Sequence, residues 1–202
     1  MIWAGLAVLA LAWLWPLPQL GLPPFSTHMT MHMAVVAVAA PLLALGLSGT
    51  RLDLVTRRPG WMAAIPASFA ELMIVWVWHA PALHDLAREL LWVRALEQAS
   101  FLLAGLWLWQ SALGGRAEQR RARATAGVTA LLLTAMHMTL LGALLVVSPR
   151  VLYPCAPLCG GFDPLTDQHV GGAIMLLVGG AAYLAGGVGL TADALAHRSE
   201  AR

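Results

Sequence analysis

The chain has 202 residues, of which 59% are hydrophobic and 11% are charged, and its formal net charge is +2. Soluble domains carry charges at about a quarter of their positions, whereas the mean hydropathy here is +0.73. This composition excludes an ordinary soluble domain and indicates an integral membrane protein. The small positive charge gives little support to nucleic-acid binding, and we expect the arginines to contact membrane lipid headgroups.

Apolar segments near the roughly 20 residues that cross a bilayer recur along the chain. The first lacks the charged n-region and cleavage site of a signal peptide, so we expect a retained span. No stretch is long enough for a separate soluble domain, and we predict an all-α fold, a polytopic membrane helical bundle forming one domain over residues 1–202. The six expected spans are Ile2–Leu20, His28–Leu47, Met62–Trp78, Trp92–Leu113, Thr125–Val147 and Val170–Leu190.

The basic residues orient these spans. Every one of the 12 Lys+Arg positions is an arginine, and nine lie in "RLDLVTRR", "RAEQRRAR" or the tail "HRSEAR". Only Arg88, Arg94 and Arg150 lie in the other connections. Because basic residues concentrate in cytoplasmic loops, we expect both termini to be cytoplasmic and the remaining loops to lie on the outer side.

Two histidines open the second span. His28 and His32 are four residues apart and share one helix face, a spacing that lets two imidazoles bind one metal ion. Met29 and Met33 repeat this spacing on the adjacent strip. Imidazole with thioether suits copper, Cu(I) in particular, better than magnesium or calcium. The alternative is that the histidines lie in the membrane interface and the methionines fill core gaps.

Three further polar residues are expected at the same outer face. His79 closes the third span, Glu97 lies in the first turns of the fourth, and His169 stands at the start of the sixth. The histidines are candidate metal ligands with His28 and His32. Glu97 is either an additional ligand or a carboxylate near the positive end of its helix dipole.

Two ionisable residues are expected deeper in the bilayer. His137 lies about 15 Å from the outer end of its span, and Glu71 lies two turns below His79 on nearly the same face. Such groups are costly in a membrane and usually face the bundle interior with a partner. Each is either a structural polar contact or a ligand or proton carrier on an inward path. Of Met136 and Met138, at most one can share the direction of His137.

The loop "SPRVLYPCAPLCGGFDPLTDQHVGG" carries both cysteines. An oxidising outer compartment would favour a disulfide between Cys155 and Cys159, and transient copper handling by the thiolates is the alternative. Structural zinc is disfavoured because no second cysteine pair exists. Asp163 and Asp167 are expected to cap the start of the last helix, although either could contact a partner protein or the metal site.

Five sequence blocks now follow one another in a recognisable order. They are "HMTMHM…APLLALG", "WVWHAPALHDLA", "ALEQASFLLAGLWLW", "LLGALLVVSPRVLYP" and "DPLTDQHVGGAIMLLVGG". From His28 to about Leu190 the chain resembles the multi-spanning CtaG-type cytochrome c oxidase assembly factors, a family distinct from the single-span copper chaperone that shares the CtaG name. The resemblance implies a bacterial cytoplasmic-membrane protein that matures haem-copper oxidase, with copper delivery to an oxidase subunit as its role.

The resemblance also carries residues over. It departs at Gln98, where the family often has histidine, and at His84, where it often has tyrosine. Cys155, Cys159, His137 and His169 look like features of this chain or its subgroup. The positions that match family motifs are His28, His32, His79, Pro81, Asp163, Asp167 and Gln168.

The combined prediction is a copper site that opens to the outer face, holds Cu(I) and passes it to a haem-copper oxidase subunit. An enzyme is not expected, because no nucleophile stands beside a base and no glycine-rich phosphate loop is present. The alternatives are a membrane cytochrome with a haem held by histidine or methionine, a copper transporter with Glu71 and His137 as inner stations, and an inert scaffold. A homodimer is left open.

Overall fold

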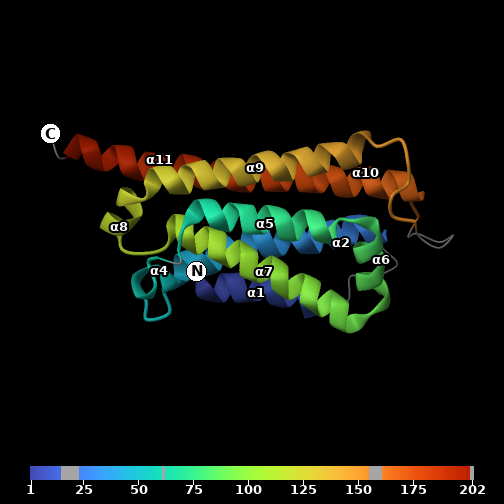
Figure 1. Ribbon diagram of the computed structural model, residues 1–202, viewed down its shortest axis with the longest axis horizontal. Coiled ribbons are helices and arrows are strands. Elements are labelled where there is room, and N and C mark those ends of the chain that lie inside the picture. The colour runs from blue at the N-terminus through green and yellow to red at the C-terminus, as the bar shows by residue number, and fades with distance from the viewer. Residues whose placement is uncertain (15–22, 61, 155–160, 201–202) are drawn as a thin grey trace.

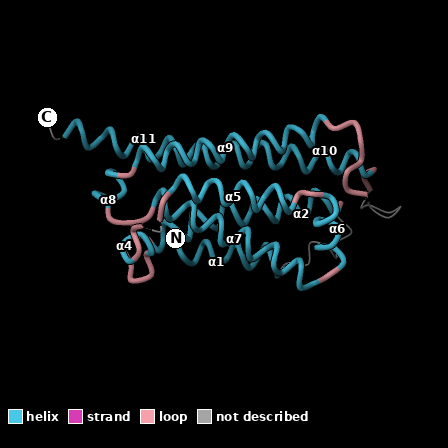
Figure 2. The backbone as a smooth tube through the Cα atoms, viewed as in Figure 1, coloured by secondary structure: helices cyan, strands magenta, loops and turns pink. Residues whose placement is uncertain are grey.

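The computed structural model describes residues 1–14, 23–60, 62–154 and 161–200, and these residues form helices and no strand, as predicted (Figures 1 and 2). Two segments, labelled η2 and η3, have the wider π-helical turn. In chain order the elements are α1 (Ile2–Leu14), α2 (Pro24–Met33), η2 (Ala34–Ala39), α3 (Ala40–Leu47), α4 (Leu54–Arg57), α5 (Ala64–Trp78), α6 (Pro81–Glu89), α7 (Leu91–Leu113), α8 (Ala117–Ala122), α9 (Ala124–Val147), α10 (Pro164–Ile174), η3 (Met175–Gly179) and α11 (Gly180–Glu200).

Each predicted span coincides with a helix or a continuous run of helices. Within the described residues, three are long and apolar enough to cross a membrane: Pro24–Leu47, Ala124–Val147 and Pro164–Ala196. The helices α1 and α5 are apolar but shorter, and the predicted end of the first span lies outside the described residues. The second and last runs begin earlier than predicted, because a proline occupies the first helical position of α2 and α10 and extends each helix beyond its apolar stretch.

The second helix contains its π segment for a local reason. In the π register the carbonyl of residue i pairs with the N–H of residue i+5, and the N–H of Ala40 indeed bonds to the carbonyl of Val35. The matching partner for the carbonyl of Val36 would be Pro41, which has no N–H. The indole Nε1 of Trp109 in α7 donates to this carbonyl at 2.9 Å. A side chain from a neighbouring helix thus satisfies the group that the proline leaves unpaired.

Close packing by small residues places α10 against both α9 and α2. A Cβ added at Gly172 would lie 2.8 Å from the carbonyl oxygen of Gly142, and one added at Gly171 would lie 2.5 Å from Phe25. Neither position has room for a larger residue, as expected for close helix approach in a membrane bundle. The contact with Phe25 fixes the start of α2, which carries His28 and His32.

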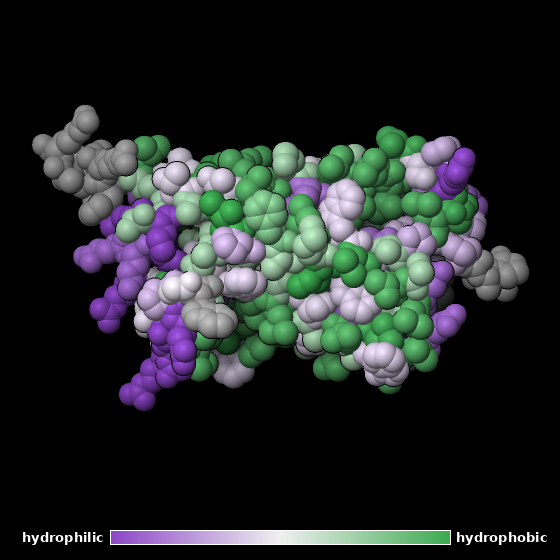
Figure 3. Space-filling view, viewed as in Figure 1, coloured by the Kyte–Doolittle hydropathy of each residue, from purple (hydrophilic) through white to green (hydrophobic). Residues whose placement is uncertain are grey.

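The two ends of the bundle differ in chemistry. Figure 1 shows both termini at the end formed by α4 and α8, with α6 and the start of α10 at the opposite end. Hydrophilic side chains gather at the α4 and α8 end, whereas apolar side chains cover much of the length of the bundle (Figure 3). The arginine-rich connections and the termini therefore share one end, as the predicted topology requires.

Candidate metal centre

Five buried polar side chains meet at the end of the bundle that carries α6. His28 and His32 come from α2, His79 ends α5, His84 lies on α6 and Glu97 on α7, and each is at most 4% exposed. The ring centroids of His28 and His84 are 4.9 Å apart, those of His32 and His79 5.5 Å, and those of His28 and His79 6.0 Å. These five residues are called the histidine cluster below.

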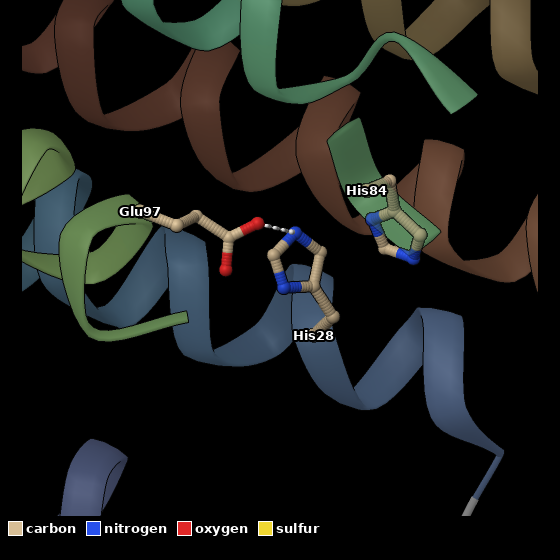
Figure 4. A group of neighbouring side chains, drawn as sticks. All are labelled: His28, His84 and Glu97. Carbon is tan, nitrogen blue, oxygen red and sulfur yellow. Dashed lines mark ion pairs between the residues drawn. The ribbon is translucent and has the colours of Figure 1, made fainter. Parts of the chain in front are cut away.

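The tightest part of the histidine cluster has metal-ligand spacing. His28, His84 and Glu97 each offer a ligand atom, and these atoms all lie within 4.8 Å of one another. Figure 4 shows the imidazole of His28 turned toward Glu97, with the ring of His84 on its other side. The distance from Nε2 of His28 to Oε1 of Glu97 is 3.9 Å. One cation could contact all three groups after small side-chain movements.

Most side-chain atoms of the histidine cluster that could bind a metal have no hydrogen-bond partner within the described part of the chain. Buried polar atoms are nearly always paired, and leaving one unpaired costs about 1–3 kcal/mol. Each neutral imidazole has one lone pair and each carboxylate oxygen has lone pairs, so several unpaired nitrogen and oxygen atoms in one place form a set of ligand atoms suited to a metal ion. The unpaired atoms are Nε2 of His28, both ring nitrogens of His32, Nε2 of His79, Nδ1 of His84 and Oε1 of Glu97.

The tautomer of His79 follows from its hydrogen bond. Its Nδ1 lies 2.6 Å from the carbonyl oxygen of Val75, and because a carbonyl only accepts, Nδ1 carries the proton. The lone pair of a neutral ring is then on Nε2. Metal-binding histidines are commonly oriented in this way by a carbonyl. The hydroxyl of Tyr153 donates to the carbonyl of His79 at 2.6 Å and holds the end of α5 in place.

Arg88 of α6 brings a positive charge into the histidine cluster. Its Nη2 donates to Oε2 of Glu97 at 2.6 Å, and its Nη1 lies 3.1 Å from Nδ1 of His28. Burial lowers the pKa of Arg88, while Glu97 opposes this shift. Burial, followed by the charges of Arg88 and His79, lowers the pKa of His84 to about 3. His84 is therefore neutral near pH 7, the protonation state that binds metals.

Aromatic rings and one helix cap support the histidine cluster. Phe101 packs on His32 with ring centroids 4.1 Å apart, and Tyr153 stacks on Phe25 at 4.2 Å. Asp167 of α10 accepts hydrogen bonds from the backbone N–H groups of Phe25 at 2.8 Å and Ser26 at 2.9 Å. These contacts fix the start of α2, and with it the direction of His28 one turn later.

A small cavity adjoins the histidine cluster. Its volume is about 110 Å³, and both His28 and Arg88 line it. The side chain of Arg88 is 30% exposed, whereas Glu97 behind it is fully buried. The cavity thus leads toward the side chains that could hold a cation. The other lining residues are Pro24, Thr27, Met31, Arg94 and Gln98.

The predicted thioether and sixth-span ligands lie against other groups. Met29 and Met33 are at most 1% exposed, and they pack near Gly171 and Gly179 of the last helix. His169 lies five residues inside its helix, and its Nε2 is 3.0 Å from the carbonyl oxygen of Ser148. Of the predicted set, the structure therefore brings together four residues, which come from three neighbouring helices: His28, His32, His79 and Glu97.

The two deep residues are both buried, as expected. Glu71 is fully buried, and the hydroxyl of Tyr183 donates to its Oε1 at 2.7 Å. His137 is 3% exposed, and neither ring nitrogen has a hydrogen-bond partner within the described residues. Met138 is buried whereas Met136 is 62% exposed, so the two methionines point to different sides of α9.

The two aspartates have different roles. Asp163 accepts hydrogen bonds from the N–H groups of Leu165 and Thr166 and caps α10, as predicted. The prediction that Asp167 also caps this helix is wrong. It lies one turn inside α10, where its side chain faces α2 and caps that helix instead. Cys155 and Cys159 lie outside the described residues.

Two residues of the site were not predicted from the sequence. His84 stood out only as a departure from the family pattern, and Arg88 only as one of few arginines in the outer connections. They are four residues apart, so a helix over "PALHDLARE" places them on one face. Recognising that short amphipathic helix would have identified both.

The fold and the site define an all-helical membrane protein with a buried, histidine-rich centre at one end of its bundle. Residues 1–196 match the family described as cytochrome c oxidase caa3 assembly factor (Caa3_CtaG). The chain therefore belongs to this family of oxidase assembly factors, which confirms the resemblance noted in the sequence. No curated protein and no solved structure gave a significant match.

Proposed function

We propose that this assembly factor binds copper in the histidine cluster and passes it to a subunit of a haem-copper oxidase. The observation that carries this proposal is the set of unpaired donor atoms on His28, His32, His79, His84 and Glu97. Copper is the cargo in this proposal, and the residues present suit it, since imidazole is a good copper ligand.

The donor set favours a transition metal over a hard cation. Neutral imidazoles suit copper, zinc, iron and nickel, whereas magnesium and calcium prefer oxygen ligands. Family membership makes copper the cargo to test first, because the assembled product is a cytochrome c oxidase. Met29 and Met33 pack toward Gly171 and Gly179, so imidazoles are the principal ligands proposed for Cu(I) or Cu(II).

Transfer requires access as well as affinity. The cavity beside His28 and Arg88 supports a path by which an ion could enter and leave. A structural metal site usually has its coordination sphere filled by protein ligands, whereas a site that exchanges its ligands keeps a position open. Partial exposure of Arg88 next to a fully buried Glu97 is the arrangement expected of a site that opens toward a partner.

The proposed location is the bacterial cytoplasmic membrane, with both termini in the cytoplasm and the histidine cluster toward the outer face. The arginines in and around α4 and α8 support this orientation, since basic loops stay cytoplasmic. An impermeant thiol reagent should label Cys155 or Cys159 in intact cells after reduction. Labelling only after lysis would place the cluster on the inner side.

Copper analysis of variants tests the function. We would purify wild type, His32→Ala, His79→Ala and the control His169→Ala, confirm folding by size exclusion, and titrate each with Cu(I) under anaerobic conditions and with Cu(II) and Zn²⁺. Oxidase activity would be measured in cells carrying the same variants. Loss of copper and of oxidase activity is expected for the two cluster variants, with His169→Ala close to wild type.

Other results would contradict the proposal. If both cluster variants keep full copper and support normal oxidase assembly, their histidines are structural. A Soret band in the purified protein would favour a haem site. Copper uptake into vesicles that depends on this protein would favour a transporter over a delivery protein.

A further inference from the structure

We infer that Arg88 occupies the cation position of the histidine cluster in the metal-free protein and is displaced when a metal ion binds. The inference rests on the proposed function and concerns how that site is held closed and reopened. It begins from the two contacts of one guanidinium, with Glu97 at 2.6 Å and with His28 at 3.1 Å.

The contact with His28 sets the tautomer of that ring. A guanidinium has only donors, so Arg88 donates to Nδ1 of His28, which must hold its lone pair there. The proton of the neutral ring is then on Nε2, the atom that faces Oε1 of Glu97 at 3.9 Å. A metal ion bound at Nε2 needs the lone pair on that atom.

Metal binding through Nε2 would therefore move the proton of His28 to Nδ1. Two donors would then face each other across the 3.1 Å between Nδ1 and the Arg88 guanidinium, which breaks that hydrogen bond. The hydrogen bond from Arg88 to Nδ1 of His28 and a metal ion on Nε2 exclude each other, whatever the identity of the metal.

Charge acts in the same direction. Glu97 is fully buried, and one of its oxygens is engaged by Arg88 while the other is unpaired. A metal ion that uses this carboxylate would lie a few ångströms from the guanidinium, and like charges repel strongly at that distance in a partly buried site. The two cations compete for one carboxylate.

The side chain of Arg88 has space into which it can move. Its side chain is 30% exposed and lines the cavity of about 110 Å³ beside the histidine cluster. A long, flexible side chain can turn into that space without movement of α6. Because such coupling is reciprocal, a bound metal ion would also hold the positive charge of Arg88 outward, so metal-free and metal-loaded forms would differ in charge at this surface.

The alternative role for Arg88 is to support Glu97 as a metal ligand. Arg88 would then remain in place and orient Glu97 as a ligand, as groups behind a metal ligand often do. The two roles predict opposite effects of removing Arg88, because a competitor lowers metal affinity and a support raises it.

The first experiment compares copper affinity in wild type, Arg88→Gln and Arg94→Gln. Arg94 lines the same cavity and acts on Glu97 through its charge, so Arg94→Gln controls for the loss of one nearby positive charge. Cu(I) dissociation constants would be measured anaerobically against a chromophoric chelator. Arg88→Gln should bind copper about tenfold more tightly than wild type, with a change under about threefold for Arg94→Gln.

Weaker or unchanged binding in Arg88→Gln, or an equal gain in Arg94→Gln, would overturn the inference while leaving the proposed function intact. If neither wild type nor Arg88→Gln binds copper, the proposed function fails and the inference with it.

A second measurement needs no folded variant of Arg88. In protein labelled with ¹⁵N-histidine, the His28 signal is identified as the one missing from His28→Gln. The metal-free protein should show the proton of His28 on Nε2, and the copper-loaded protein should show it on Nδ1. A proton on Nδ1 in the metal-free protein would refute the inference.

Discussion

Replacing Asp167 with asparagine should destabilise the protein far more than the same change at an exposed cap. Asp167 is 1% exposed, and its two oxygens accept the N–H groups of Phe25 and Ser26 at 2.8 and 2.9 Å. Asparagine retains one acceptor oxygen and presents an NH₂ group in place of the other. One buried N–H then loses its partner, and the start of α2 loses a negative charge.

The size of the effect follows from these two losses. A hydrogen bond to a charged group contributes about 1.5–3 kcal/mol, and a negative charge at a helix start about 0.3–1 kcal/mol. The expected loss is therefore about 2–4 kcal/mol, which lowers the melting temperature by roughly 4–16 °C at about 2–4 °C per kcal/mol for a chain of this size. Copper affinity should fall as well, because the start of α2 directs His28.

Thermal unfolding in one detergent, followed by circular dichroism, measures the change. Asp163→Asn is the matched control, since Asp163 caps α10 from an exposed position and asparagine is itself a good cap. Its melting temperature should stay within about 2 °C of wild type, equivalent to less than about 1 kcal/mol. Equal shifts for the two variants would show that the contact between α10 and α2 contributes nothing beyond an ordinary cap.

Three further changes test the surroundings of the site. Tyr153→Phe removes the donor to the carbonyl of His79 and should cost about 1–3 kcal/mol in thermal unfolding, with weaker copper binding; unchanged copper affinity would mean that this contact does not position His79. Trp109→Phe leaves the carbonyl of Val36 unpaired and should cost a similar 1–3 kcal/mol, whereas an unchanged melting temperature would show that another group satisfies it. Between pH 6.5 and about 3, the unfolded chain protonates His84 while the folded metal-free protein keeps it neutral, so stability should fall with decreasing pH by up to about 1.4 kcal/mol per unit; His84→Gln should reduce that slope, and an identical slope would contradict the assignment.

The main helices could be predicted because each is built on a long apolar segment, and three of the predicted spans meet the length and hydropathy needed to cross a bilayer. The first residues of α2 and α10 were harder to predict, because Pro24 and Pro164 lie before the apolar stretches. The short helix α6 was not predicted, because the search for spans does not detect a short polar helix. Its nine residues carry too few apolar side chains for a span, and its buried face depends on contacts with α5, α7 and Phe25 of α2.

The candidate site could be predicted in part. The spacing of His28 and His32 fixed their common face, and the end of the third span fixed the level of His79. The sequence could not show which neighbour each face meets. Successive helical residues differ by about 100° in direction, so when the histidines of α2 turn toward His79, Met29 and Met33 turn toward α10 and η3.

If the protein delivers copper as proposed, the contacts of Arg88 also explain how its metal-free form stays stable. A cluster of buried imidazoles around an unpaired carboxylate would be costly in a metal-free protein, at about 1–3 kcal/mol for each unpaired atom. Arg88 reduces this cost by pairing with Oε2 of Glu97 and Nδ1 of His28. The remaining unpaired atoms keep the site able to gain free energy from a metal ion, while the guanidinium limits that gain. The proposed transfer to an oxidase subunit would require a moderate affinity of this kind.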